Sequence, residues 1–139
     1  MMRAKHKPIL LIEDDQVDAM IVERALKEIR VSNPLDMACN GEEALDYLRD
    51  PEKENPCIML LDLNMPKMNG VEFLREVKSD DSLKKIPILV LTTSREVGDR
   101  KDTFSNGVAG YMIKPVEYKD FVEVIKTIDK YWTLSELPE

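Results

Sequence analysis

Short apolar runs alternate along the chain with longer segments of helical periodicity. The run at 9–12 contains no polar residue, which is typical of a strand buried on both faces of a sheet. The same character recurs at intervals, and it predicts five strands at 9–12, 35–39, 57–61, 88–91 and 111–113.

The segments between these runs carry apolar residues at helical spacing. Ile21, Val22, Ala25, Leu26 and Ile29 form one such stripe, which marks an amphipathic helix. Comparable stripes predict four more helices, at 40–48, 71–77, 95–106 and 121–128. The helix at 95–106 has few apolar anchors. Strands that alternate with helices pair in parallel through right-handed crossovers. We therefore predict an α/β fold, a doubly wound five-stranded parallel sheet with helices on both faces.

Composition narrows the class of protein. A length of 139 residues indicates a single domain over 1–139, with a core at about 7–130 and a tail at 131–139. A net charge of −7 argues against direct binding of nucleic acid. No apolar stretch approaches the roughly 20 residues that a membrane span needs. Cys39 and Cys57 are too few for a disulfide scaffold, so we expect both to be small buried residues in a reducing cytoplasm.

Polar residues follow four of the predicted strands. Glu13 and Asp14 follow the first strand, Asp62 the third, Thr92 the fourth and Lys114 the fifth. Sites in doubly wound sheets form at the carboxyl ends of the strands, so these side chains should converge. Carboxylates a few ångströms apart repel by about 4 kcal/mol each at an effective dielectric constant of 20. A divalent cation with oxygen ligands, of which Mg²⁺ fits best, offsets this repulsion.

Polar residues that follow strands also have ordinary structural explanations. Asp15 suits an N-cap that accepts a hydrogen bond from the backbone near Asp18. Asn40 suits the same role at the second helix. A threonine after a strand commonly satisfies local backbone groups. The joint placement of acids, hydroxyl and ammonium at one sheet edge is what favours a functional site.

At these residues the sequence resembles the receiver domains of two-component response regulators. The resemblance extends from 9 to 128 and is carried by IEDD at 12–15, DLNMPKMNG at 62–70, VLTTS at 90–94 and YMIKP at 111–115. It implies the strand order 2-1-3-4-5 of flavodoxin-like folds. It also implies a switch protein that catalyses only its own phosphorylation and dephosphorylation, and is not otherwise an enzyme.

The resemblance assigns the chemistry to particular residues. Asp62 becomes the nucleophile that a sensor histidine kinase phosphorylates, and Glu13, Asp14 and Asp62 become Mg²⁺ ligands together with the backbone carbonyl of Asn64. Thr92 is expected to offer its hydroxyl to a phosphoryl oxygen.

The resemblance also implies the parts of a switch. Lys114 is expected to pair with the acceptor or the phosphoryl group, and its bond to Pro115 to be cis. Movement of Thr92 and rotation of Tyr111 should alter the face made by the fourth helix, fifth strand and fifth helix. That face is expected to bind a downstream protein, while Ser94 tunes the lifetime of the phosphorylated state.

A narrower resemblance is to the stand-alone regulators paired with bacterial phytochrome-type kinases. The Thr92-Thr93-Ser94 segment and the ending YWTLSELP at 131–138 carry it. We expect no effector domain after the last helix. The tail either extends a homodimer face or packs back on its own domain.

Other functions fit less well. The acidic loop after the first strand would repel the phosphate of FMN, which argues against an electron carrier. An aspartyl phosphatase needs Asp-x-Asp after the first strand, and no nucleotide-binding glycine motif occurs. The alternative that remains is an interaction module that keeps the fold without being phosphorylated.

Overall fold

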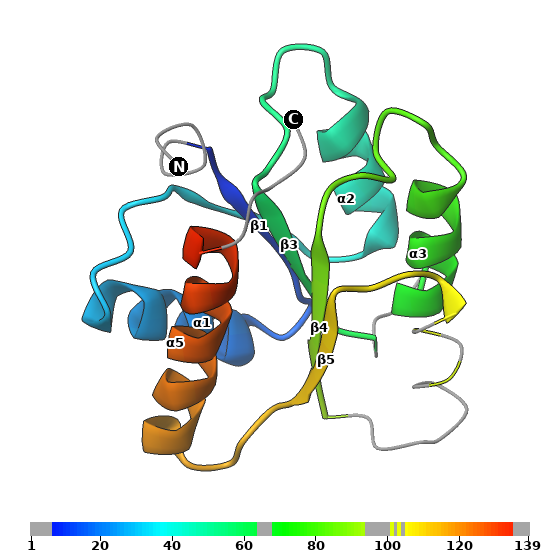
Figure 1. Cartoon of the computed structure of the whole chain (residues 1–139). Helices are drawn as coiled ribbons and strands as arrows, with labels where there is room; N and C mark the ends of the chain where they lie inside the picture. Colours follow the sequence, from blue (N-terminus) through cyan, green and yellow to red (C-terminus); the bar gives the residue numbers. More distant parts are fainter. Residues whose placement is uncertain (1–6, 64–67, 94–100, 102, 104, 135–139) are drawn as a thin grey trace.

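Five parallel strands form one sheet in the order β2-β1-β3-β4-β5 (Figure 1). The computed structural model describes residues 7–63, 68–93, 101, 103 and 105–134. The strands are β1 (Ile9–Ile12), β2 (Leu35–Ala38), β3 (Ile58–Leu61), β4 (Ile88–Thr92) and β5 (Gly110–Ile113). The predicted fold class and strand order are confirmed, and the predicted strand bounds differ by one residue at most.

Helices cover both faces of this sheet. They are α1 (Gln16–Glu28), α2 (Gly41–Arg49), α3 (Gly70–Lys78) and α5 (Tyr118–Leu134). Figure 1 shows α1 and α5 on one face and α2 and α3 on the other. Of the helix predicted at 95–106, the structure describes 101, 103, 105 and 106, and the first three of these are helical.

Alternation along the strands divides the core into two clusters. Ile9 and Leu11 pack with α1 and α5, whereas Leu10 and Ile12 pack with α2 and α3. Successive side chains of a strand point to opposite faces, so an unbroken apolar run fills both clusters at once. Burial of each large side chain contributes on the order of 2 kcal/mol, which explains why these runs dominate the fold.

The strands end level with one another at the edge of the sheet that carries the polar residues. Ile12 is in register with Leu61 of β3, and the backbone N–H of Asp62 donates to the carbonyl of Ile12 at 3.1 Å. On the other side, the N–H of Lys114 donates to the carbonyl of Thr92 at 2.8 Å. The polar residues that follow the strands therefore lie along one edge.

Helix caps fix where the helices begin at this edge. The side chain of Asp15 accepts hydrogen bonds from the N–H groups of Val17 and Asp18, and Asn40 accepts one from the N–H of Glu43. Both N-cap predictions are confirmed. Such a cap contributes about 1 kcal/mol to stability, and here it also aims the first turn of α1 at the strand ends.

Two glycines allow the backbone after β3 to pack closely. A side-chain carbon at Gly70 would lie 2.6 Å from the Cα atom of Leu63, and one at Gly41 would lie 2.9 Å from the carbonyl oxygen of Met68. Neither contact is possible for a larger residue without backbone movement. The start of α2 and the start of α3 thus both press on the segment that follows Asp62.

The cysteines differ in environment. Cys57 is buried, as predicted, but Cys39 is exposed, so the prediction of burial for Cys39 is wrong. Cys39 follows β2, which lies at the edge of the sheet formed by the described residues, and Met37 of that strand is exposed too. No helix in the described parts of the chain is both long and apolar enough to cross a membrane.

Candidate functional site

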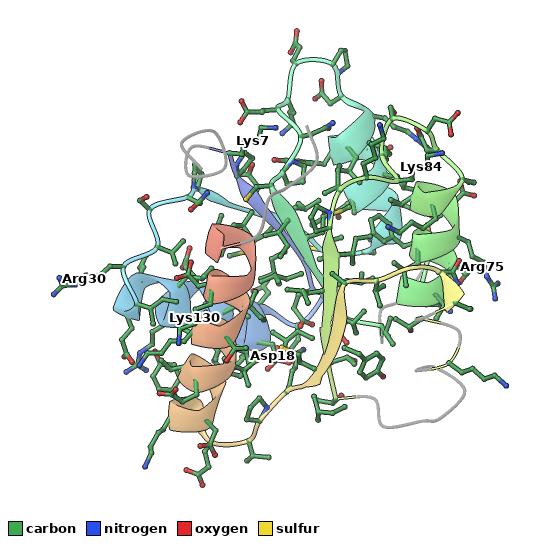
Figure 2. The ribbon with its side chains drawn as sticks, in the orientation of Figure 1. Lys7, Asp18, Arg30, Arg75, Lys84 and Lys130 are labelled. Carbon is green, nitrogen blue, oxygen red and sulfur yellow. The ribbon has the colours of Figure 1, made fainter. Side chains whose placement is uncertain are left out.

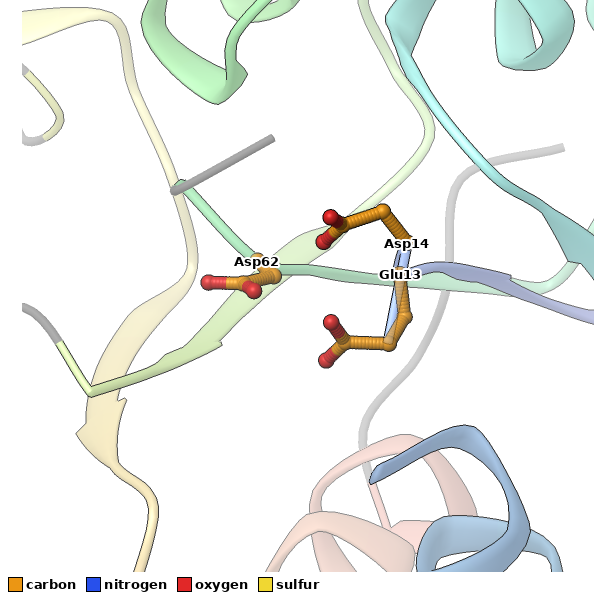
Figure 3. Close-up of side chains that lie close together, drawn as sticks. All are labelled: Glu13, Asp14 and Asp62. Atoms are coloured by element: carbon orange, nitrogen blue, oxygen red, sulfur yellow. The ribbon is translucent and has the colours of Figure 1, made fainter. Parts of the chain in front are cut away.

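Three carboxylates meet at the carboxyl ends of β1 and β3. Glu13 and Asp14 follow β1, Asp62 follows β3, and Figure 3 shows the three side chains close together. One oxygen of each lies within 4.8 Å of the others. Glu13 and Asp62 are 5% and 7% exposed, whereas Asp14 is open to solvent. This set of hard oxygen donors with one open side fits Mg²⁺, which binds a few carboxylates and keeps several waters.

A buried ammonium lies beside these acids. The Nζ atom of Lys114 makes its shortest contact with Glu13, lies 2.9 Å from an oxygen of Asp18 and 3.5 Å from Oδ2 of Asp62. The side chain of Lys114 is 6% exposed, so water screens these pairs little. Lys114 thus balances part of the negative charge that the acids concentrate at this edge.

The two oxygens of Asp62 have different neighbours. Oδ1 accepts a hydrogen bond of 2.7 Å from the hydroxyl of Thr92, which is fully buried, while Oδ2 faces Lys114. The carboxylate is therefore held in a fixed orientation by the ends of β4 and β5.

Burial and charge shift the pKa values at this site in ways that matter for binding. The pKa of Glu13 is raised to about 7, and burial of its carboxyl group is the largest cause. The ammonium of Lys114 lowers this pKa in part, and the negative charge of Asp62 raises it further. For Lys114, burial acts to lower the pKa, but the hydrogen bonds to Glu13 and Asp18 outweigh it and raise the value to about 12. Lys114 is therefore cationic at neutral pH, and Glu13 can hold a proton that a cation would displace.

Most of the residues predicted for the site lie together. Glu13, Asp14, Asp62, Thr92 and Lys114 form one group. In a separate place, the half-buried Tyr111 of β5 packs against the cluster formed with α2 and α3. Asn64 and Ser94 lie outside the described residues.

The prediction of a cis bond between Lys114 and Pro115 is wrong, because the described residues contain no cis peptide bond. The N–H of Lys114 extends the β4–β5 ladder through its bond to Thr92, so the backbone runs on in an extended form before the proline. A trans bond suits that path and is favoured by about 0.5–1 kcal/mol.

Asp18 is a site residue that the sequence patterns did not identify. It lies three residues after the N-cap Asp15, in the first turn of α1, and its carboxylate reaches Lys114. The cap prediction held part of the signal, because it placed the first turn of α1 near the strand ends. It did not give the side of the helix that faces Lys114.

Residues 9–126 match the response regulator receiver domain, and the chain belongs to this family. It is thus a signalling module of two-component systems. The response regulator Rcp1 of Synechocystis sp. is 36% identical over 130 residues, which span 91% of this chain and 88% of Rcp1. The probable methanogenesis regulatory protein FilR2 of Methanothrix harundinacea is 38% identical over 127 residues, 89% of this chain and 82% of FilR2.

Solved structures agree with the fold and with the narrower resemblance to phytochrome response regulators. The phosphorylated cyanobacterial phytochrome response regulator RcpA matches with a TM-score of 0.89 and 35% identity, covering 96% of this chain and 99% of RcpA. The Mn²⁺-bound form of Rcp1 matches with a TM-score of 0.88 and 33% identity, with the same coverage.

Proposed function

We propose that Asp62 accepts a phosphoryl group from a histidine kinase in a Mg²⁺-dependent reaction. The observation that carries this proposal is the position of the Asp62 carboxylate between two further acids, the Thr92 hydroxyl and the Lys114 ammonium. Phosphoryl transfer needs alignment and neutralisation of charge more than covalent help from the protein, and this arrangement offers both.

The residues of the site have distinct tasks in this reaction. An oxygen of Asp62 attacks phosphorus, the phosphorus–nitrogen bond of the donor histidine breaks, and the electron pair stays on the imidazole. The product is an acyl phosphate, which water can cleave to reset the switch. Lys114 neutralises charge on the phosphoryl oxygens. The Thr92 hydroxyl breaks its hydrogen bond to Asp62 and donates to one of these oxygens instead.

Glu13, Asp14 and Asp62 would hold the cation, which supplies positive charge to the phosphoryl oxygens when bound. The donor chemistry supports Mg²⁺, and the existence of a Mn²⁺-bound form of the relative Rcp1 supports a divalent ion in this fold. The role of the Asn64 backbone carbonyl as a further ligand stays a prediction.

Exposed apolar residues near the site support docking of the kinase there. Val17 and Met20 of α1 are 64% and 66% exposed, and Val116 is fully exposed. Along the sequence, Val17 and Met20 lie within two positions of Asp18, and Val116 lies two positions after Lys114, the two residues that pair beside the site. Isolated exposed apolar side chains are common, but three beside one catalytic edge suit a partner that covers it. The likeness to RcpA favours a phytochrome-type kinase. A cytoplasmic location is part of this proposal, because a histidine kinase takes its phosphoryl group from ATP.

Docking and chemistry can be tested apart. Replacing Met20 with serine should slow transfer from a cognate kinase at least tenfold and leave phosphorylation by acetyl phosphate unchanged. Met37, which is exposed on β2 at the far edge of the sheet, is the matched control. Equal effects of both variants would contradict docking at α1.

The output of the switch follows from the same contacts. Phosphorylation should draw Thr92 away from its bond to Asp62, and Tyr111 should turn into the space that Thr92 leaves. The surface of the fourth helix, β5 and α5 would then bind a downstream protein. Amide exchange on that surface should change on phosphorylation, and unchanged exchange would contradict the coupling. The homodimer prediction depends on tail side chains outside the described part of the chain.

The experiment that tests the proposed function is intact-protein mass after incubation with acetyl phosphate, with and without Mg²⁺. One added phosphoryl group that requires Mg²⁺ and disappears in Asp62→Asn is expected. Asp120→Asn, an exposed acid in the first turn of α5, is the control and should be phosphorylated normally. Absence of any adduct, with Mg²⁺ binding intact, would instead favour a phosphorylation-independent interaction module.

A further inference from the structure

The ammonium of Lys114 has three hydrogen-bond donors and three carboxylates around it. Two of these acids, Glu13 and Asp18, accept hydrogen bonds from Nζ, and the third, Asp62, lies 3.5 Å away. An ammonium has no planar geometry to fix its direction, so its acceptors decide where each N–H points. With two donors engaged by Glu13 and Asp18, the remaining one is left for Asp62, whose Oδ2 lies 3.5 Å from Nζ.

Asp18 differs from Glu13 in one respect that matters for a reaction with a cation. The oxygens that could ligate a metal come from Glu13, Asp14 and Asp62, and Asp18 is not among them. A cation therefore competes with Lys114 for Glu13 but not for Asp18. Asp18 comes from α1, whereas the three ligands come from the ends of β1 and β3, and Figure 2 shows it at the start of that helix beside the strand ends.

We propose that Asp18 is a positioning residue that holds the ammonium of Lys114 against the phosphoryl-accepting carboxylate while the cation occupies Glu13. This inference rests on the proposed phosphorylation of Asp62 and adds a residue to it. Because Asp18 lies outside the set of metal donors and its carboxylate binds the ammonium, it acts through Lys114. Without it, Lys114 would lose the acceptor that remains once a cation has engaged Glu13.

A simpler explanation is that Asp18 only supplies negative charge near the start of α1, where acids are favoured by the helix dipole. That role depends on the charge alone, so it predicts that Asp18→Asn loses as much as Asp18→Ala. It also predicts a weaker attraction for Mg²⁺ and no specific change at Lys114. The two explanations therefore separate by measurement.

The test uses the full chain and the variant Asp18→Ala, with Glu23→Gln as a control that removes one charge from the same helix further along. The first readout is the nitrogen-15 spectrum of the Lys114 ammonium, assigned with Lys114→Arg. Hydrogen-bonded ammonium groups exchange slowly with water and give a visible signal. The second readout is the rate of phosphorylation by acetyl phosphate across a Mg²⁺ titration.

We expect Asp18→Ala to broaden or abolish the Lys114 signal and to lower the phosphorylation rate at saturating Mg²⁺ roughly 10-fold, the scale seen when a supporting partner is lost. The Mg²⁺ concentration at half-saturation should change less than the rate, and Glu23→Gln should change neither. Asp18→Asn, which keeps an oxygen acceptor, should recover part of the signal and part of the rate.

A double variant shows whether Asp18 acts through Lys114. In a Lys114→Ala background, Asp18→Ala should cause no further loss of rate. A further loss there, an unchanged Lys114 signal in Asp18→Ala, or an effect confined to Mg²⁺ half-saturation would overturn the proposal. If the unaltered chain is not phosphorylated at all, the proposed function fails, and the ammonium signal still decides whether Asp18 holds Lys114.

Discussion

Two clusters of charged side chains in this molecule differ sharply in burial and geometry. At the strand ends, the side chains of Lys114 and Glu13 are 6% and 2% exposed and in direct contact. Between α2 and α3, Arg49 lies 3.7 Å from Glu76 and 3.8 Å from Asp80, with Arg49 and Glu76 about half exposed. The same kinds of groups are thus assembled once inside the protein and once on its surface.

The contrast indicates why the buried cluster exists. Exposed pairs such as Arg49–Glu76 contribute little to stability and are easily replaced. Buried charges lose their hydration, and their mutual attraction often fails to offset that loss. A cluster that holds Glu13 and Asp62 against Lys114, with Asp14 beside the two acids, is therefore poorly explained by stability. It agrees with the proposed binding of a cation and a phosphoryl group.

The largest effect should come from removing the buried ammonium group of Lys114. We expect Lys114→Met, without Mg²⁺ at pH 8, to lower the free energy of unfolding by about 3–5 kcal/mol, because buried carboxylates lose their counter-charge. Urea unfolding measures this, and Lys114→Arg, which keeps the charge, should lose less. A change near zero for the methionine variant would mean that the buried cluster resembles the exposed one.

Mg²⁺ should stabilise the cluster by binding to the folded chain. At a free concentration 100 times its dissociation constant, the expected gain in unfolding free energy is about 2.7 kcal/mol. Thermal or urea unfolding across a Mg²⁺ series measures the gain. Asp14→Asn should need a higher concentration for the same gain, whereas Asp120→Asn should behave as the unaltered chain. Stabilisation that ignores Asp14 would place the cation elsewhere.

Affinity for Mg²⁺ should depend on pH through Glu13. Its pKa is raised to about 7 in the cation-free protein, so below that pH a proton occupies the carboxylate and must leave when the cation binds. Affinity should therefore rise with pH, by up to about tenfold per unit, and level off above pH 7. Calorimetry at several pH values measures the slope, which Glu13→Gln should flatten. A constant affinity from pH 5 to 8 would show that Glu13 releases no proton.

The smallest effect should come from the surface cluster. Arg49→Ala removes both of its contacts, and the urea midpoint should stay within experimental scatter because water and salt already screen them. Raising the salt concentration should shift the urea midpoint of this variant and that of the unaltered chain by the same amount. A clear loss of stability would show that these exposed pairs matter more than their geometry suggests.

Much of the fold was predictable because the signals are local. The run at 9–12 fills both faces of a central strand, so its composition alone excludes a half-exposed strand. Asp62 and Thr92 were predictable as neighbours for a similar reason, since parallel strands bring their carboxyl ends to one edge. The structure places the Thr92 hydroxyl 2.7 Å from Asp62 accordingly.

What escaped prediction depends on side-chain reach and on the open side of the sheet. The contact between Asp18 and Lys114 joins residues far apart in sequence and depends on the rotation of α1, which an apolar stripe defines only coarsely. Exposure of Cys39 depends on its place beyond an edge strand, and the trans bond before Pro115 depends on how β5 ends. None of these follows from spacing along the chain.

The most direct test of the account is to find which residue carries the phosphoryl group. Borohydride reduces an acyl phosphate of aspartate to homoserine, which survives digestion and peptide mass mapping. After treatment with acetyl phosphate and Mg²⁺, we predict homoserine at position 62 and unmodified aspartate at position 14, with no conversion when Mg²⁺ is left out. Conversion at another acid, or none despite bound Mg²⁺, would contradict the assignment of Asp62 as the phosphoryl acceptor.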